Sequence, residues 1–82
     1  MNKQIGLRLQ QVRRERSLTL EQVSEATLIR VHYLQAIEAG EFEKIPSATQ
    51  ARGFIRSYAG FLSLDIENLF KKVGEENEED EL

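Results

Sequence analysis

Apolar residues recur at helical spacing along almost the whole chain, and this periodicity constrains the fold more than any other feature of the sequence. Ile5, Leu9 and Val12, for example, fall on one face of residues 3–16. No segment alternates apolar and polar residues as a strand on a sheet surface would. We therefore expect an all-α fold, a five-helix bundle with short connections. The helices are predicted over residues 3–16, 19–26, 30–39, 47–62 and 64–74.

Start and stop signals support these boundaries. Thr19 and Ser47 are each followed three residues later by a glutamine, Gln22 and Gln50, which is the pattern of a capping box. Gly40 supplies the left-handed residue that commonly ends a helix. The second and fourth helices are therefore predicted from local chemistry as well as from periodicity.

Residues 18–40 have the length and pattern of a helix-turn-helix unit. A helix of about two turns, a connection at residues 27–29 and a second amphipathic helix follow one another. Leu34 and Ile37 are expected to face inward from that second helix, and a loop over residues 41–46 to follow it.

Charge is unevenly distributed along the chain. The 82 residues are enough for one domain, and residues 75–82 carry six of the fourteen acidic side chains. Residues 1–74 hold eleven basic and eight acidic side chains, so the overall net charge of −3 conceals a body with a net charge of +3. We expect residues 1–74 to form the helix-turn-helix domain. The acidic tail at 75–82 is expected to be disordered, because a run of like charges cannot bury itself.

The composition excludes several function classes. The chain has no cysteine and a single histidine, His32, so it offers neither a thiolate nor a multi-histidine metal site. The five glycines are scattered, and no nucleophile–base pair stands out. No run of about 18 apolar residues occurs, so no transmembrane segment is expected within the chain. We predict a protein that is not an enzyme and uses neither cofactor nor metal.

Two stretches of sequence resemble known families. The run Leu-Thr-Leu-Glu-Gln-Val-Ser-Glu-Ala from residue 18, with Tyr-Leu-Gln-Ala-Ile-Glu-Ala-Gly from residue 33, resembles the phage-repressor class of helix-turn-helix domains. Ile-Pro-Ser at 45–47 and Ala-Arg-Gly-Phe-Ile-Arg-Ser-Tyr-Ala at 51–59 resemble the cytoplasmic domain of the RodZ family of cell-shape proteins. This second resemblance covers about residues 5–72.

The resemblance to RodZ implies a membrane-anchored cytoskeletal adaptor. Proteins of that family bind the actin-like filament protein MreB through this domain, on the cytoplasmic side of the bacterial inner membrane, and so link filaments to the membrane for cell-wall elongation and cell shape. The fourth helix supplies aromatic contacts at positions held here by Gln50 and Phe54, and Gln50 departs from that pattern. A transmembrane helix and a periplasmic domain normally follow, and this chain contains neither. Its acidic residues 75–82 also differ from the basic stretch expected beside a membrane.

A DNA-binding regulator of the phage-repressor class is the alternative function. Base reading requires mainly Arg, Lys, Asn or Gln on the outward face of the second helix of the motif. A step of about 100° per residue from Leu34 predicts four outward residues: His32, Gln35, Ala36 and Ala39. Of these, Gln35 alone belongs to the base-reading set. The turn position where repressors commonly have glycine is occupied here by Leu28 or Thr27.

The charges near this helix do not favour DNA binding either. Glu38, Glu41 and Glu43 lie at its far end, where they would repel phosphates. Arg30 and the arginines of residues 13–16 can supply a few phosphate contacts. We therefore expect DNA binding to be weak and nonspecific.

The helix over residues 47–62 is the predicted partner-binding surface. Its core stripe is Ala51, Ile55, Tyr58 and Leu62. Glycine inside a helix costs about 1 kcal/mol relative to alanine, and it is favoured where another backbone must come close. Exposed aromatic residues commonly anchor interfaces. On these grounds the predicted contact set centres on the flank beside the core stripe, with Gln50, Gly53, Phe54 and Ser57. It also includes two further aromatic residues, Tyr58 and Phe61, and two arginines of the opposite flank, Arg52 and Arg56. The alternative is that the fifth helix or the 41–46 loop covers Phe54 and Phe61.

Overall fold

The computed structural model describes residues 3–65 and 68, and every secondary-structure element in that part of the chain is a helix. The elements are α1 (Lys3–Glu15), α2 (Leu20–Thr27), α3 (Val31–Ala39), the short 3-10 helix η1 (Phe42–Lys44) and α4 (Ala48–Phe61). The all-α class with a helix-turn-helix is thus confirmed. The helix-turn-helix is formed by α2, the connection at residues 28–30, and α3.

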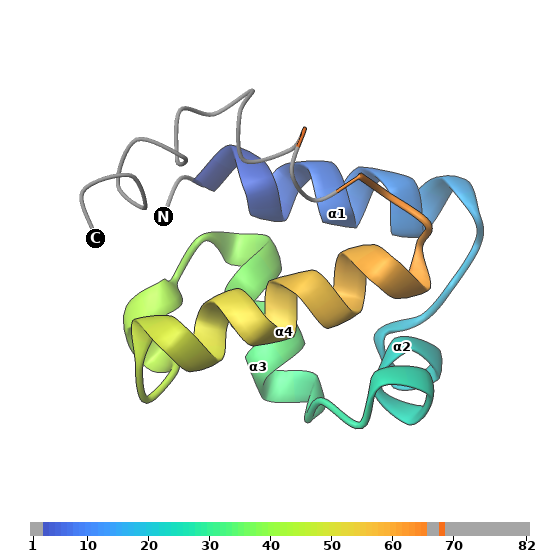
Figure 1. The fold of residues 1–82 in the computed structure, drawn as a ribbon. Helices are drawn as coiled ribbons and strands as arrows, with labels where there is room; N and C mark the ends of the chain where they lie inside the picture. The colour runs from blue at the N-terminus through green and yellow to red at the C-terminus, as the bar shows by residue number, and fades with distance from the viewer. Residues whose placement is uncertain (1–2, 66–67, 69–82) are drawn as a thin grey trace.

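The central helix is α3, which packs against α1, α2 and α4. Figure 1 shows α4 crossing in front of α3, with α1 along the top of the molecule and α2 at one end. The buried side chains of all four α-helices meet in one core, which includes Ile5, Leu9, Leu34, Ile37 and Ile55. The inward positions predicted from periodicity on α1 and α3 are therefore confirmed.

The capping box predicted at Thr19 is confirmed, and at Ser47 one of the two bonds of the predicted capping box is present. The Thr19 side chain accepts a hydrogen bond from the Gln22 backbone N–H at 3.1 Å, and the Gln22 side chain accepts one from the Thr19 N–H at 2.8 Å. This reciprocal pair satisfies two donors that a helix start would otherwise leave open. At α4, the Ser47 hydroxyl accepts from the Gln50 N–H at 3.1 Å. Gly40 ends α3 with a φ of 75°, in the left-handed region.

One glycine is required by packing that periodicity does not reveal. Gly6 lies inside α1, directly against the backbone of α3. A Cβ atom at this position would lie 1.9 Å from the carbonyl oxygen of Ile37 and 3.1 Å from the Cα of Glu38. Gly6 therefore allows the two helices to approach more closely than any side chain permits.

Two predicted features lie largely outside the described residues. These are the fifth helix, predicted over residues 64–74, and the acidic tail at 75–82. At the start of the predicted fifth helix, the Asp65 side chain accepts a hydrogen bond from the Asn68 N–H at 3.2 Å, the bond expected of a capping aspartate. Among the residues that the structure describes, no helix is long and apolar enough to cross a membrane.

Candidate protein-binding surface on α4

The inward side of α4 belongs to the core. Ala51, Ile55, Tyr58 and Ala59 are buried, and Leu62, just past the end of the helix, is buried with them. The predicted core stripe is thus confirmed. Tyr58 has no exposed surface, so its place in the predicted contact set is wrong: a side chain that fills the interior cannot touch a partner.

The outward side of α4 presents small and polar residues in a line along the helix. Gln50, Gly53 and Ser57 are exposed, as are Gly60 and Phe61 further along the same face. A Cβ atom added at Gly53 or Gly60 would meet nothing within 4 Å. Internal packing therefore does not require glycine at either position. We call Gln50, Gly53, Ser57, Gly60 and Phe61 the α4 outer face.

Phe61 is the apolar residue of this face. Its side chain remains 38% exposed, although aromatic residues usually bury most of their surface. The residues that precede it along the face, Ser57 and Gly60, are small. Phe61 has the character of an interface anchor.

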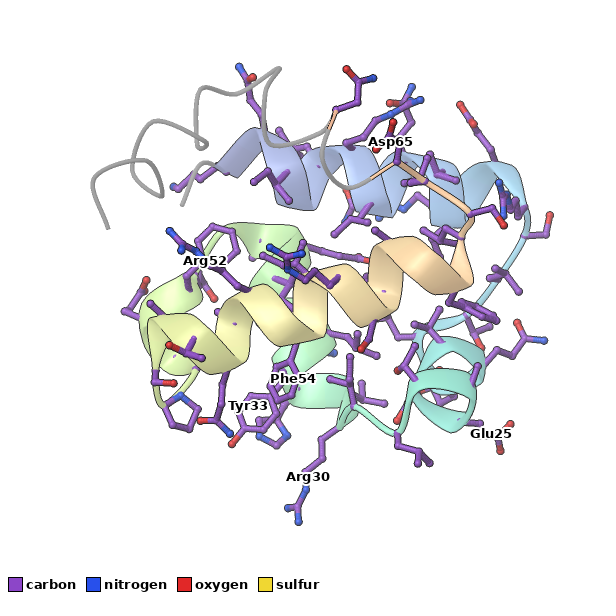
Figure 2. All side chains as sticks on the ribbon, in the orientation of Figure 1. Glu25, Arg30, Tyr33, Arg52, Phe54 and Asp65 are labelled. Atoms are coloured by element: carbon purple, nitrogen blue, oxygen red, sulfur yellow. The ribbon has the colours of Figure 1, made fainter. Side chains whose placement is uncertain are left out.

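Phe54 is half-buried and borders the outer face. Its ring stacks on that of Tyr33 in α3, with centroids 5.4 Å apart and an interplanar angle of 30°. The Tyr33 ring in turn lies 4.1 Å, centroid to centroid, from His32. Figure 2 shows Phe54 and Tyr33 side by side on the side of the molecule away from α1. The ring contact of Phe54 is therefore made by α3.

Tyr33 was not among the predicted surface residues, although it extends the aromatic surface beside α4. It is a half-buried residue of the helix-turn-helix that periodicity alone does not pair with Phe54. The signal available in the sequence is weak: an aromatic residue beside the outward His32, on a helix whose other outward residues are small or polar.

The two arginines of α4 differ in their surroundings. Arg56 is exposed and Arg52 is half-buried. In Figure 2 the Arg52 side chain extends toward α1, on the opposite flank of α4 from Phe54, as the helical spacing predicts. Arg52 is therefore separated by the width of the helix from the aromatic pair.

The buried carboxylate of Glu38 corrects the predicted charge distribution. Glu38 was expected to repel phosphates together with Glu41 and Glu43, but it is 5% exposed and forms an ion pair with Arg13 of α1, with Nε 2.7 Å from Oε2. The hydroxyl of Tyr58 also donates a hydrogen bond to Glu38. Arg13 and Glu38 thus neutralise each other inside the domain. Neither contributes to the surface potential in the way the sequence suggests.

The outward face of α3 is sparse in base-reading groups. His32, Gln35 and Ala39 are exposed as predicted, but Ala36 is 3% exposed and belongs to the core, so its outward placement was wrong. Gln35 is then the one exposed side chain of α3 that commonly reads base edges. Arg30, just before α3, is exposed and can contact a phosphate.

The fold and its exposed surfaces define a helix-turn-helix domain with a surface beside the motif that suits protein contacts. A family model described as a helix-turn-helix domain matches residues 8–69. Two curated relatives match as well. The uncharacterized membrane protein YmfM of Bacillus subtilis is 36% identical over 55 residues, which cover 67% of this chain and 19% of that protein. The cytoskeleton protein RodZ of Streptococcus pneumoniae is 35% identical over 63 residues, which cover 77% of this chain and 23% of that protein.

The chain belongs to this helix-turn-helix family and is a RodZ-type domain. It spans about a fifth of the length of the curated relatives that it matches. No solved structure gave a significant match to it.

Proposed function

We propose that this domain is a non-catalytic cytoskeletal adaptor that binds the actin-like filament protein MreB. In the protein that carries it, the domain would link filaments to the cytoplasmic side of the bacterial inner membrane and so maintain cell shape. The relatives support the two halves of this role separately: one is described as a cytoskeleton protein and the other as a membrane protein. The proposal needs no cofactor and no reaction.

The observation that carries the proposal is the α4 outer face. Gly53 and Gly60 are open glycines within one helix, and each lowers its intrinsic stability by about 1 kcal/mol relative to alanine. A partner whose backbone or flat surface comes close to α4 explains why small residues stand there. Phe61 and the half-buried Phe54 then provide apolar area at the border of that surface.

A role as a sequence-specific DNA reader is less well supported. The part of α3 that would enter the major groove offers Gln35 and the imidazole of His32 for base contacts. Leu28, at the tip of the turn, is 88% exposed and would face the DNA backbone with an apolar side chain. Phosphate contacts dominate DNA affinity, and Arg30 is the cation best placed at the start of α3 to make one.

Binding to purified MreB tests the proposal, and Gly53→Leu is the variant that tests the surface. A Cβ atom at this exposed position meets nothing within 4 Å and glycine is a poor helix former, so the variant is expected to fold at least as stably as the parent. We expect it to weaken MreB binding by about 2 kcal/mol or more, the level of an interface hot spot. Phe54→Ala is expected to weaken binding to a similar degree. Because that variant also loses the Tyr33 contact, its stability must be measured in parallel.

The matched control is Gln11→Leu, which adds an apolar side chain at an exposed position of α1. It should leave the affinity unchanged. If both leucine variants bind normally, the domain is an adaptor whose contact surface lies elsewhere. If the parent chain does not bind MreB at all, the adaptor role is wrong, and a duplex-binding assay over a range of salt concentrations then tests the DNA alternative.

A further inference from the structure

The turn of the helix-turn-helix carries an apolar side chain that the fold does not use. Leu28 is 88% exposed, the largest value among the large apolar residues that the structure describes. Its backbone is in the left-handed region, with φ 64° and ψ 23°. Leucine is unfavourable there because its Cβ crowds the backbone, and glycine is the residue that this conformation favours. Folding alone accounts for neither the exposure nor the choice of residue.

The turn that presents Leu28 is held firmly. The N–H of Leu28 donates to the carbonyl of Ser24 at 2.7 Å. The Thr27 hydroxyl donates to the carbonyl of Val23 at 2.8 Å, and the Ser24 hydroxyl donates to the carbonyl of Ile29. Ile29, the next residue, is 4% exposed and anchors the turn in the core. Leu28 is therefore a preorganised apolar projection, and little conformational entropy is lost when it is buried against another surface.

Two opposite charges lie within three residues of Leu28 in the chain. Glu25 of α2 and Arg30 at the start of α3 are both exposed. Among the described residues, neither side chain takes part in a hydrogen bond or ion pair. Figure 2 shows both side chains pointing out from the side of the molecule away from α1. The turn thus presents an acid, a leucine and a base in that order along the chain.

We propose that the helix-turn-helix turn is a self-association surface whose partner is a second copy of this chain. An acid–apolar–base arrangement is complementary to itself under two-fold symmetry. Leu28 of one copy packs on Leu28 of the other, and each Glu25 faces the other copy's Arg30. In such an isologous contact the same patch serves both copies. This inference does not depend on the proposed filament partner, because it uses a different surface from the α4 outer face.

Sedimentation equilibrium of this chain up to millimolar concentration tests the proposal. A concentration-dependent monomer–dimer equilibrium is expected. Leu28→Ala should raise the dimer dissociation constant at least about tenfold, because it removes most of the apolar area buried at the contact. Glu25→Arg and Arg30→Glu, each alone, place like charges opposite each other and should also shift the chain to monomer. The double variant E25R/R30E restores opposite charges and should restore the dimer.

Leu7→Ala is the matched control. Leu7 is 57% exposed on α1, so its truncation removes a similar exposed side chain from a different helix and should leave the equilibrium unchanged. A chain that stays monomeric at millimolar concentration would overturn the proposal. A dimer that tolerates Leu28→Ala, or that the double charge swap fails to restore, would place the self-association surface elsewhere and would equally overturn it.

Discussion

Arg13 of α1 holds Glu38 of α3 through two separate nitrogen–oxygen contacts. Its Nε lies 2.7 Å from Oε2 and its Nη2 lies 3.0 Å from Oε1, while Nη1 donates to the carbonyl of Leu18 at 2.8 Å. Gln10 and Tyr58 donate to the same carboxylate. A buried charge with a bidentate arginine and two further donors is fully satisfied, so the network joins α1, α3 and α4 without leaving a polar group unpaired.

Glu38→Ala is expected to destabilise the domain by about 3–5 kcal/mol, because it leaves the Arg13 guanidinium largely buried without its counter-ion. Urea denaturation followed by circular dichroism measures this loss. Glu41→Ala is the control, since Glu41 pairs with Lys44 at the surface and such pairs contribute about 0–1 kcal/mol. Equal effects of the two substitutions would show that the buried network does not stabilise the fold.

The stability of the domain should fall at alkaline pH through Tyr58. Burial, with the hydrogen bond to Glu38, raises the pKa of the Tyr58 hydroxyl well above its usual range. The unfolded tyrosine loses its proton near pH 10, while the folded one keeps it. The contribution of the Tyr58 hydroxyl to the free energy of unfolding is therefore complete below about pH 10 and is lost as the pH rises further.

Comparing the free energy of unfolding of the parent chain and Tyr58→Phe across pH 8–11 isolates this effect. The difference between the two proteins should shrink above about pH 10, since phenylalanine cannot ionise. A difference that stays constant over the whole range would contradict the assignment.

Two glycine-to-alanine substitutions should have opposite effects. Gly6→Ala places a methyl group 1.9 Å from the carbonyl oxygen of Ile37, and a backbone atom cannot move aside, so α1 must separate from α3. We expect a loss of about 3 kcal/mol or more, at the upper end of overpacking effects. Gly53→Ala meets nothing and should gain up to about 1 kcal/mol from helix propensity. Thermal unfolding of both variants distinguishes them, and a stable Gly6→Ala protein would show that the close approach is not needed.

Leu28→Gly should make the isolated domain more stable even though it removes a side chain. The left-handed conformation at φ 64° costs a non-glycine residue roughly 1–2 kcal/mol, and the greater freedom of glycine in the unfolded chain offsets part of that gain. A net increase of up to about 1 kcal/mol is expected. Leu28→Ala keeps the strained backbone and should leave stability nearly unchanged. If alanine and glycine behave alike in chemical denaturation of dilute monomer, strain at this turn is negligible.

Local signals in the sequence predicted most of the fold. The capping box of Thr19 and Gln22 and the left-handed stop at Gly40 depend on residues within one turn of each other, so the chain order reveals them directly. Inward positions such as Leu9 and Ile55 follow from helical periodicity, which one helix carries by itself. Open glycine at Gly53 was also predictable, because a glycine inside a helix is unusual without a reason.

The failures share one cause, which is contact between residues far apart in the chain. A charged residue such as Glu38 is expected at the surface because of its charge, and the sequence does not show that Arg13 lies opposite. Ala36 was placed outward because one helix viewed alone has no neighbours, yet packing of α3 within the bundle buries it. The Tyr33–Phe54 stack and the contact of Gly6 with Ile37 are likewise set by helix–helix geometry.

The polar network around Glu38 can be completed only after α4 has been synthesised. Arg13 leaves the ribosome first, Glu38 follows, and Tyr58 emerges last with the α4 residues that close the core. A nascent chain that ends before α4 therefore retains an incomplete carboxylate site and an open interior, and small domains of this kind generally fold as one unit. Because the α4 outer face is carried by the same helix, that face is displayed only by chains whose interior is already closed. Truncated translation products would accordingly offer it to no partner.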